Sequence, residues 1–170
     1  MMGQKTKPNQ LLPAITLIPL ILVSALIFRF SAQTGEKSTE VSNGLTIRLL
    51  MLFTDLSEYT VDELKETVIR LRHKIRKTAH VLEYAAFGFF LALHLSTWIK
   101  KLPWLWGLAV SVIYGLSDEL HQYFVGERVM QLRDVGFDLV GAALGIGAFL
   151  LLRFVFRRFR ENRAARNTPG

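Results

Sequence analysis

The sequence contains no cysteine, and this absence alone excludes several kinds of protein. Without thiols the chain has no disulfide framework, no thiolate nucleophile and no cysteine-based metal site, and cysteine usage does not indicate its redox compartment. The chain also lacks an internal repeat and a second segment that could form a soluble domain. A length of 170 residues therefore predicts one domain.

What the chain has in excess is apolar surface and positive charge. Hydrophobic residues make up 51% of the sequence and aromatic residues 11%, with a mean hydropathy of +0.29. This composition is too apolar for an ordinary soluble domain and predicts an integral membrane protein. The net charge is +7. Because the basic residues flank apolar runs instead of forming one basic face with interleaved aromatic residues, they fit lipid headgroups and predict no nucleic-acid partner.

Four apolar runs predict four membrane-spanning helices. They cover residues 11–28, 79–99, 103–124 and 135–156. The first run is long enough to cross about 30 Å of hydrocarbon at about 1.5 Å per residue. We interpret it as an anchor and not as a cleaved signal peptide, because Phe30-Ser31-Ala32 lacks a small-x-small cleavage pattern. Gly141 and Gly145, in the last run, have the spacing of residues that allow close helix packing.

The remaining segments are polar or amphipathic. Residues 1–10 are short and basic, and residues 157–170 form a basic tail that we expect to be disordered. Residues 31–76 carry apolar side chains at helical spacing, and Thr60 with Glu63 resembles a capping box at the start of a helix. This connector is too charged to span a membrane, so we expect helices that lie on the membrane surface or over the bundle, or else a solvated connector.

The predicted fold is therefore an all-α membrane protein with four transmembrane helices in an antiparallel bundle and amphipathic helices in the first connector. Residues 11–156 form the membrane domain. An even number of spans places both termini on one side. Lys5 and Lys7, the turn at Lys100 and Lys101, and the arginines of the tail favour the cytoplasmic side for both termini.

Alternating spans would bring most of the polar residues to one membrane face. The end of the first helix, the start of the second, the end of the third and the start of the fourth all lie there. The residues concerned are Ser31, Gln33, Arg76, Lys77, His80, Glu83, Asp118, Glu119, His121, Gln122, Arg128, Arg133, Asp134 and Asp138. Ionisable groups in a membrane are costly unless they are paired or face a wet cavity, so this gathering indicates a site. His73 and His94 lack such neighbours, and we expect them to be structural or solvated.

Helical spacing sorts these residues into faces. Arg76, His80 and Glu83 lie on one face at positions i, i+4 and i+7, and Asp134 and Asp138 repeat this spacing in the last helix. Arginines, carboxylates and histidines of this kind bind a phosphate or sugar headgroup, transfer protons or hold a hard metal ion. The alternative is that they pair with one another and fix helix packing.

A second face belongs to the third predicted span. Asp118 lies one helical turn from His121 and Gln122, with Tyr114 one turn earlier on the same side, whereas Glu119 points elsewhere.

Several segments of the chain also match the pattern of a known family. They are Ser31-Ala32-Gln33; Lys77-Thr78-Ala79-His80-Val81-Leu82-Glu83-Tyr84; Tyr114-Gly115-Leu116-Ser117-Asp118-Glu119-Leu120-His121-Gln122-Tyr123-Phe124; and the later Arg128 and Asp134. With these motifs the chain resembles the VanZ-like membrane proteins, which are named for an accessory factor in glycopeptide-antibiotic resistance. The resemblance covers the four-helix body and implies a protein of the bacterial cytoplasmic membrane connected with the cell envelope and teicoplanin resistance.

The chain departs from the family pattern at two places. Asp138-Leu139-Val140-Gly141 stands where the family usually has Asn-x-x-Gly, and Ala32 splits the usual Ser-Gln pair. The first departure matters chemically, because a carboxylate cannot donate a hydrogen bond as an amide does unless it is protonated.

Three functions follow as hypotheses. The first is binding or handling of a membrane lipid or a lipid-linked cell-envelope precursor. The second is a membrane-embedded hydrolase or phosphotransferase, although the motifs of the lipid phosphatases are missing. The third is a structural partner of another membrane protein, which rests on the glycine face of the last helix.

These hypotheses share one set of candidate residues. The catalytic candidates are Glu83, Asp118, Glu119 and His121. The ligand-binding candidates are Gln33, Arg76, Lys77, His80, Glu83, Tyr84, Tyr114, Asp118, Glu119, His121, Gln122, Arg128, Asp134 and Asp138. The sequence identifies neither a cofactor nor a particular metal, and it leaves open the oligomeric state and whether the protein is an enzyme.

Overall fold

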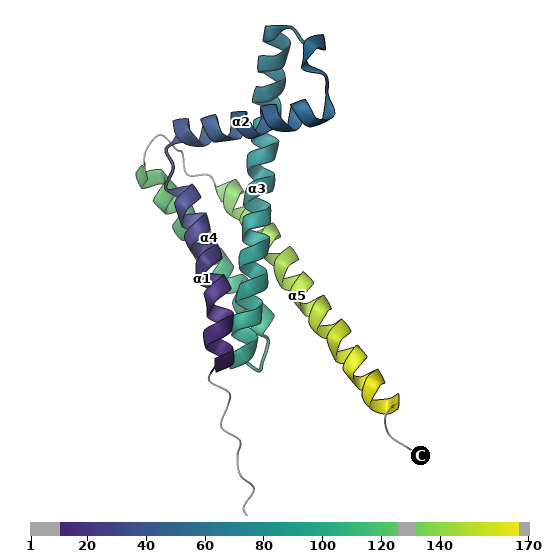
Figure 1. The fold of residues 1–170 in the computed structure, drawn as a ribbon. Helices are drawn as coiled ribbons and strands as arrows, with labels where there is room; N and C mark the ends of the chain where they lie inside the picture. The colour runs from purple at the N-terminus through teal and green to yellow at the C-terminus, as the bar shows by residue number, and fades with distance from the viewer. Residues whose placement is uncertain (1–10, 126–131, 167–170) are drawn as a thin grey trace, which may run out of the picture.

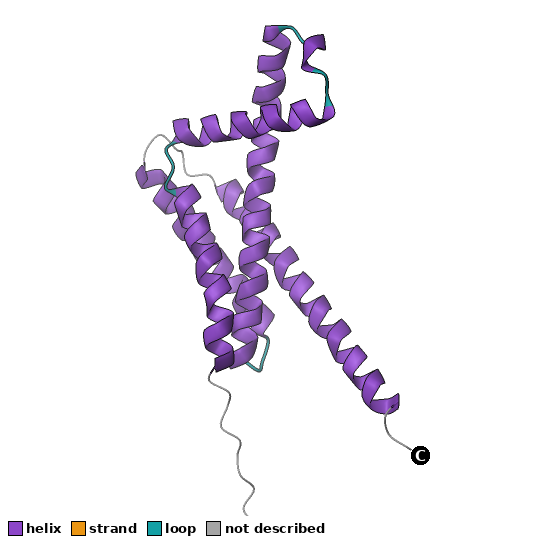
Figure 2. Cartoon of the chain, in the orientation of Figure 1, coloured by secondary structure: helices purple, strands orange, loops and turns teal. Residues whose placement is uncertain are grey.

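The computed structural model describes residues 11–125 and 132–166, and the regular structure in these residues is helical throughout (Figures 1 and 2). In chain order the elements are α1 (Leu11–Ser31), α2 (Gly35–Phe53), a 3-10 turn (Leu56–Glu58), α3 (Val61–Trp98), α4 (Pro103–Val125) and α5 (Leu132–Arg166). The predicted all-α class is confirmed. Figure 1 shows α1, α3 and α4 side by side, with α5 crossing α3 at an angle.

Three of the described helices, α1, α3 and α5, are long and apolar enough to cross a membrane. The third predicted span forms α4 but falls outside this set. Asp118 and Glu119 lower its hydropathy, as do Gly107, Ser111 and Gly115, and all five are buried against other helices. Because these residues face protein, the mean hydropathy of α4 understates how apolar its outer surface is. The four-span antiparallel bundle therefore stays a prediction.

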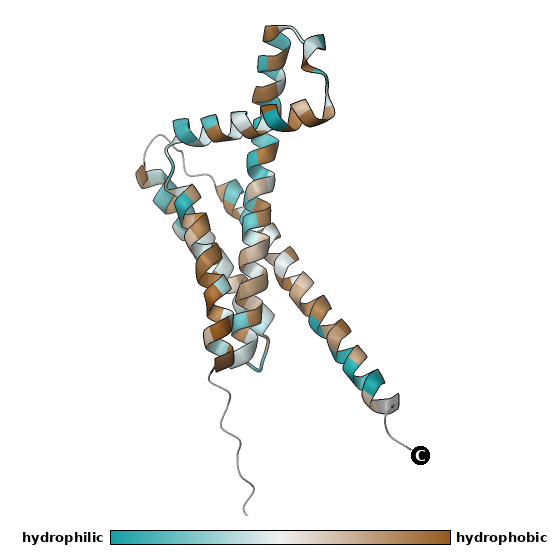
Figure 3. Ribbon diagram, in the orientation of Figure 1, coloured by the Kyte–Doolittle hydropathy of each residue, from teal (hydrophilic) through white to brown (hydrophobic). Residues whose placement is uncertain are grey.

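The helix α3 joins the second half of the predicted connector (residues 31–76) to the predicted span at residues 79–99. It begins at the predicted capping box, where the Thr60 side chain accepts from the backbone of Glu63 and the Glu63 side chain accepts from the backbone of Thr60. No proline or glycine interrupts the chain from there to Phe87, so the amphipathic part continues into the apolar part as one helix of 38 residues. At about 1.5 Å per residue it is much longer than a bilayer core. Its more polar first half extends beyond α1 and α4 (Figure 3).

The amphipathic connector forms α2, which crosses α3 over the ends of α1 and α4 (Figure 1). Its N-cap is Thr34, whose side chain accepts a hydrogen bond from the backbone of Lys37. The last turn exposes Met51, Leu52 and Phe53. A charged helix that presents large apolar side chains at one end is typical of a membrane interface.

The largest contact between helices joins α3 and α5. A Cβ atom added at Gly141 would collide with the backbone carbonyl of Val81, and one added at Gly145 would collide with that of Ala85. From the other side, Gly88 of α3 lies against the backbone of α5. The predicted close packing through small residues is confirmed, and α3 is the helix that occupies the glycine face. We call this contact the α3–α5 seam.

Among the residues that the structure describes, two small apolar cores hold the helices together. Leu20 and Ile27 of α1 pack with Tyr84, Phe87 and Leu91 of α3. The second core lies along the seam and contains Ala92, Ile146 and Phe149.

Near the other end of α1 and α3, the hydroxyl of Thr16 lies 3.1 Å from His94 Nδ1. Both His94 and His73 were expected to be structural or solvated; His94 links α1 to α3, and His73 is exposed.

The C-terminal tail differs from the prediction. Helix α5 continues to Arg166, so residues 157–166 are helical instead of disordered. Arginine and alanine favour helices, and a helix that is already formed extends without a new nucleation cost. The side chains of Arg157 and Glu161, one turn apart, form an ion pair of 2.9 Å.

Candidate functional site

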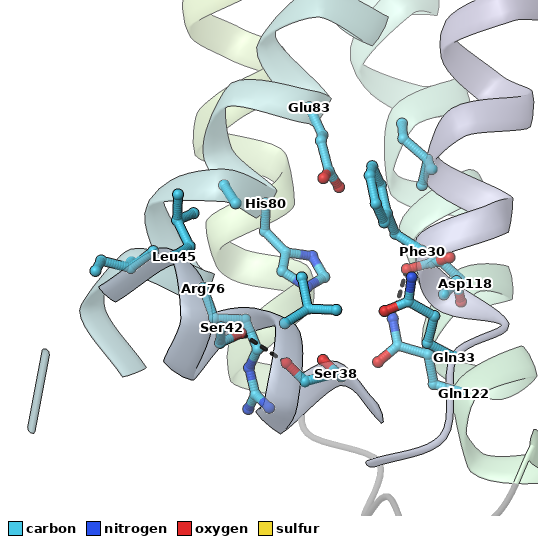
Figure 4. Close-up of a pocket in the computed structure, with 15 residues that line it drawn as sticks. Phe30, Gln33, Ser38, Ser42, Leu45, Arg76, His80, Glu83, Asp118 and Gln122 are labelled. Carbon is cyan, nitrogen blue, oxygen red and sulfur yellow. Dashed lines mark hydrogen bonds between the residues drawn. The ribbon is translucent and has the colours of Figure 1, made fainter. Parts of the chain in front are cut away.

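A cavity of about 170 Å³ lies where α1, α2, α3 and α4 meet. Its apolar wall includes Ile27 of α1, Val41 and Leu45 of α2, and Ile75 of α3. Ionisable and amide side chains form the rest of the lining (Figure 4). The cavity lies beside the C-terminal end of α1, which is the depth at which lipid headgroups meet the hydrocarbon core if α1 spans the membrane.

The helix α3 contributes a row of three side chains to this cavity. Arg76, His80 and Glu83 all line it, as their spacing on one helical face predicts. Figure 4 shows His80 and Glu83 extending from α3 toward Asp118 and Gln122 of α4. Within residues 11–125 and 132–166, Arg76 makes no hydrogen bond and no ion pair. Its guanidinium therefore has donors left for a ligand.

The polar end of α4 divides between the cavity and the protein interior. Asp118 and Gln122 line the cavity, and the amide of Gln122 donates to Asp118 Oδ2 at 2.8 Å. Tyr114 lies one turn before Asp118, and its hydroxyl donates to the Ser24 carbonyl of α1 at 2.9 Å. Of the group that we expected on one face, Asp118 and Gln122 are the pair that reaches the cavity.

The other two catalytic candidates of α4 lie outside the cavity lining. His121 stacks on Phe28 of α1, with ring centroids 4.6 Å apart. Glu119 is 3% exposed and points elsewhere, as predicted. Asp118, Glu119 and His121 therefore do not converge on one point, and Glu83 of α3 is the catalytic candidate that shares the cavity with Asp118.

The acidic residues of α5 pair with α3. Asp138 is 1% exposed, and its Oδ1 lies 3.4 Å from His80 Nδ1. One turn earlier, Asp134 Oδ1 lies 3.9 Å from Lys77 Nζ. Lys77 also lies over the ring of Phe137, 4.5 Å from its centroid. The two aspartates, one turn apart on α5, thus lie opposite Lys77 and His80 of α3. Lys77 contacts α5 and is not part of the cavity lining.

The remaining candidates fall into three places. Gln33 lines the cavity from the segment that connects α1 to α2. Tyr84 is fully buried in the core of α1 and α3, and its hydroxyl has no hydrogen-bond partner in the described part of the chain. Arg128 lies outside the described residues.

The contribution of α2 to the site was not predicted from the sequence. Ser38 and Ser42 line the cavity together with Val41 and Leu45 of the same helix. The signal was present as two serines at i and i+4, flanked by apolar residues with the same spacing. Its meaning depends on which element covers the helix, and spacing does not give that.

Three residues at this site could hold a metal ion. A ring nitrogen of His80 and one carboxylate oxygen each of Asp118 and Asp138 lie within 4.8 Å of one another. They come from α3, α4 and α5, so the ligand set exists only when the three helices are packed. Nitrogen and oxygen donors of this kind suit divalent transition-metal ions.

Comparison with known proteins gives one match. The family model VanZ/LLP1 matches residues 16–153, which include every element that lines the cavity. No curated protein and no solved structure matches the chain.

Proposed function

Because the chain belongs to the VanZ/LLP1 family, we propose that it is a multi-pass protein of the bacterial cytoplasmic membrane that binds a phosphate-bearing lipid headgroup. The ligand class is a membrane lipid or a lipid-linked cell-envelope precursor. Such a ligand would also connect the protein with glycopeptide and teicoplanin resistance, which the family resemblance implies.

The observation that carries this proposal is the cavity beneath α2, whose lining combines apolar side chains with the cationic side chain of Arg76. A lipid needs both surfaces, because its chains are apolar and its phosphate is anionic. Arginine binds phosphate through two parallel hydrogen bonds, and the guanidinium of Arg76 has no partner within the described residues to compete for them. The helix α2, with its exposed apolar end, would lie at the same interface as the headgroup.

The proposal includes four spans with cytoplasmic termini. Helix α4 crosses the membrane with its polar side turned toward α1, α3 and α5. Reporter fusions after Lys101, within residues 125–133 and after Gly170 should then report inside, outside and inside. A middle fusion on the same side as the other two would leave α4 outside the membrane and remove the shared face.

The substitution Arg76→Lys tests whether the guanidinium binds the phosphate of the headgroup, because lysine keeps the positive charge but cannot form the two parallel hydrogen bonds. We expect binding of polyprenyl phosphate or phosphatidylglycerol to the full-length protein, measured by native mass spectrometry, to weaken by about tenfold or more, since a hydrogen bond to a charged group contributes roughly 1.5–3 kcal/mol. The control is Arg70→Lys, an exposed arginine of the same helix. Comparing the two lipids separates a carrier-specific site from a general phospholipid site. Equal effects of the two substitutions would contradict the proposal.

A second function, a membrane-embedded hydrolase or phosphotransferase, is favoured by the possible metal ligands beside the cavity. Glu83 would then be the acid or base nearest the ligand, because Glu119 and His121 lie outside the lining. Release of phosphate from polyprenyl diphosphate by wild type, lost in Glu83→Gln, would establish it. Binding of the lipid without release of phosphate would support lipid binding and contradict the enzymatic function. The third hypothesis, a structural partner, loses its basis in the glycine face, because α3 occupies that face.

A further inference from the structure

We propose that His80, Asp118 and Asp138 bind one divalent transition-metal ion at the junction of α3, α4 and α5. The proposal rests on these side chains themselves, and it holds whether or not the cavity binds a lipid. Their potential ligand atoms lie within 4.8 Å of one another. Three different helices supply these residues, which lie 20 to 58 positions apart in the sequence, so no local turn accounts for their meeting.

Asp138 carries a carboxylate that is buried without a hydrogen bond among the described residues. Its side chain is 98% buried, and neither carboxylate oxygen has a hydrogen-bond partner among the described residues. His80 Nδ1 is also buried without a hydrogen bond, although it lies 3.4 Å from Asp138 Oδ1. A buried carboxylate without hydrogen bonds is costly, and buried charges normally pair fully or coordinate metals.

The separation of the two atoms fits a shared ion better than a hydrogen bond. Ligands that each lie about 2.0–2.2 Å from a tetrahedral zinc ion are about 3.3–3.6 Å from each other. The distance of 3.4 Å between His80 Nδ1 and Asp138 Oδ1 falls in this range. The three ligand atoms lie within 4.8 Å of one another, so Asp118 would complete the set once its oxygen moves closer to the other two, to the spacing of about 3.3–3.6 Å.

The surroundings of Asp118 supply the support that metal ligands usually have. Gln122 donates to Asp118 Oδ2 at 2.8 Å, which fixes the orientation of this carboxylate. His80 and Asp118 both line the cavity, so the remaining coordination positions of the ion would face it. Three protein ligands with an open position are the arrangement of catalytic zinc sites, in contrast to the four-ligand structural ones.

Charge balance also favours an ion. A neutral histidine with two ionised carboxylates has a charge of −2, which a divalent cation cancels. The rival arrangement is a metal-free site in which Asp138 is protonated or forms a simple ion pair with His80. The two arrangements differ in one measurable respect, because only the first binds metal with a defined stoichiometry.

The test uses full-length protein in detergent, without an affinity tag and stripped with a chelator. Calorimetric titration with Zn²⁺ should show one saturable site per chain, and bound metal should raise the melting temperature. Outer-shell substitutions at metal sites typically weaken affinity by about 10- to 100-fold, so loss of a ligand in His80→Ala or Asp138→Asn should weaken it at least as much. His73→Ala and Asp62→Asn, which alter an exposed histidine and an exposed aspartate of α3, should change nothing.

A measurement on wild-type protein keeps the proposal testable if a variant does not fold. Co²⁺ added to the stripped protein should give visible absorption bands that Zn²⁺ removes in equimolar amount. If wild type shows no stoichiometric Zn²⁺ binding and no Co²⁺ bands, the metal site is refuted. The same conclusion follows if folded His80→Ala and Asp138→Asn bind Zn²⁺ as tightly as the two controls.

Discussion

The α3–α5 seam and the cavity beneath α2 differ in how closely their helices pack. At the seam, Gly141 and Gly145 bring the backbones of two helices together without intervening side chains. At the cavity, four helices meet around open space that is lined by both apolar and ionisable side chains. The tight contact therefore leaves no room for side chains between the backbones, whereas the loose one leaves a cavity of about 170 Å³.

The two regions are adjacent, and this adjacency explains how the polar site is held. Gly141 contacts the carbonyl of Val81, the residue that follows His80. Asp138 lies one turn before Gly141 on the same helix. Close backbone contact at this point thus determines how near the His80 ring comes to the Asp138 carboxylate. The seam serves as the frame on which the polar groups are positioned.

The largest expected effect follows from enlarging a glycine of the seam. Gly145→Ala places a methyl group against the Ala85 carbonyl, so the helices must separate. We expect a loss of about 1–3 kcal/mol in the free energy of unfolding, as for other overpacked contacts. Denaturation of purified protein in detergent measures it.

The matched control for this substitution is Gly147→Ala. Gly147 lies on the same helix, and no atom lies within 4 Å of the position its Cβ would occupy. The control should be neutral or slightly stabilising. If the two variants have equal stability, then close contact at the seam is not what holds α3 against α5.

An intermediate effect is expected from the tyrosines near the cavity, which make opposite use of their hydroxyl groups. The hydroxyl of Tyr114 bonds the Ser24 carbonyl across α4 and α1, whereas that of Tyr84 is buried without a partner in the described residues. Tyr114→Phe should cost about 0.6–2 kcal/mol, the range measured for hydrogen bonds between membrane helices. Tyr84→Phe should be neutral or stabilising, because it removes an unsatisfied polar group.

Thermal unfolding of the two phenylalanine variants under one set of conditions distinguishes these cases. A destabilised Tyr84→Phe would mean that its hydroxyl binds a group, such as a ligand or an ordered water, that the protein needs. The region that binds this group would then include the Tyr84 hydroxyl, which lies in the core and outside the cavity lining.

Several parts of this architecture could be predicted from the sequence because their signals are local. The capping box at Thr60 depends on two residues three positions apart, and the structure has it as predicted. The row of Arg76, His80 and Glu83 follows from helical periodicity, which fixes a shared face wherever the helix lies. The long apolar runs and the helical spacing of the connector were sufficient to predict the all-α class.

Other features could not be predicted because they depend on how helices rotate and meet. Periodicity placed Asp118 and His121 on one side of α4, but it could not show that α1 would cover the histidine with Phe28 and leave the aspartate at the cavity. The continuity of α3 was missed because a change in hydropathy was taken for a boundary. A helix ends only where a residue breaks or caps it, and none does so before Trp98.

The smallest expected effect concerns the glycine in α2, above the cavity, and it completes the comparison with the seam. No atom lies within 4 Å of the position that a Cβ at Gly44 would occupy, although this helix packs on α3 as α5 does. Glycine inside a helix costs roughly 0.5–1 kcal/mol relative to alanine, so Gly44→Ala should raise the free energy of unfolding by up to about that amount while leaving lipid binding unchanged. Thermal unfolding and native mass spectrometry of this variant, beside Gly141→Ala, measure both properties. A loss of lipid binding in stable Gly44→Ala would show that α2 must approach the bundle more closely when the ligand is bound, so that the loose region, like the tight one, depends on a glycine.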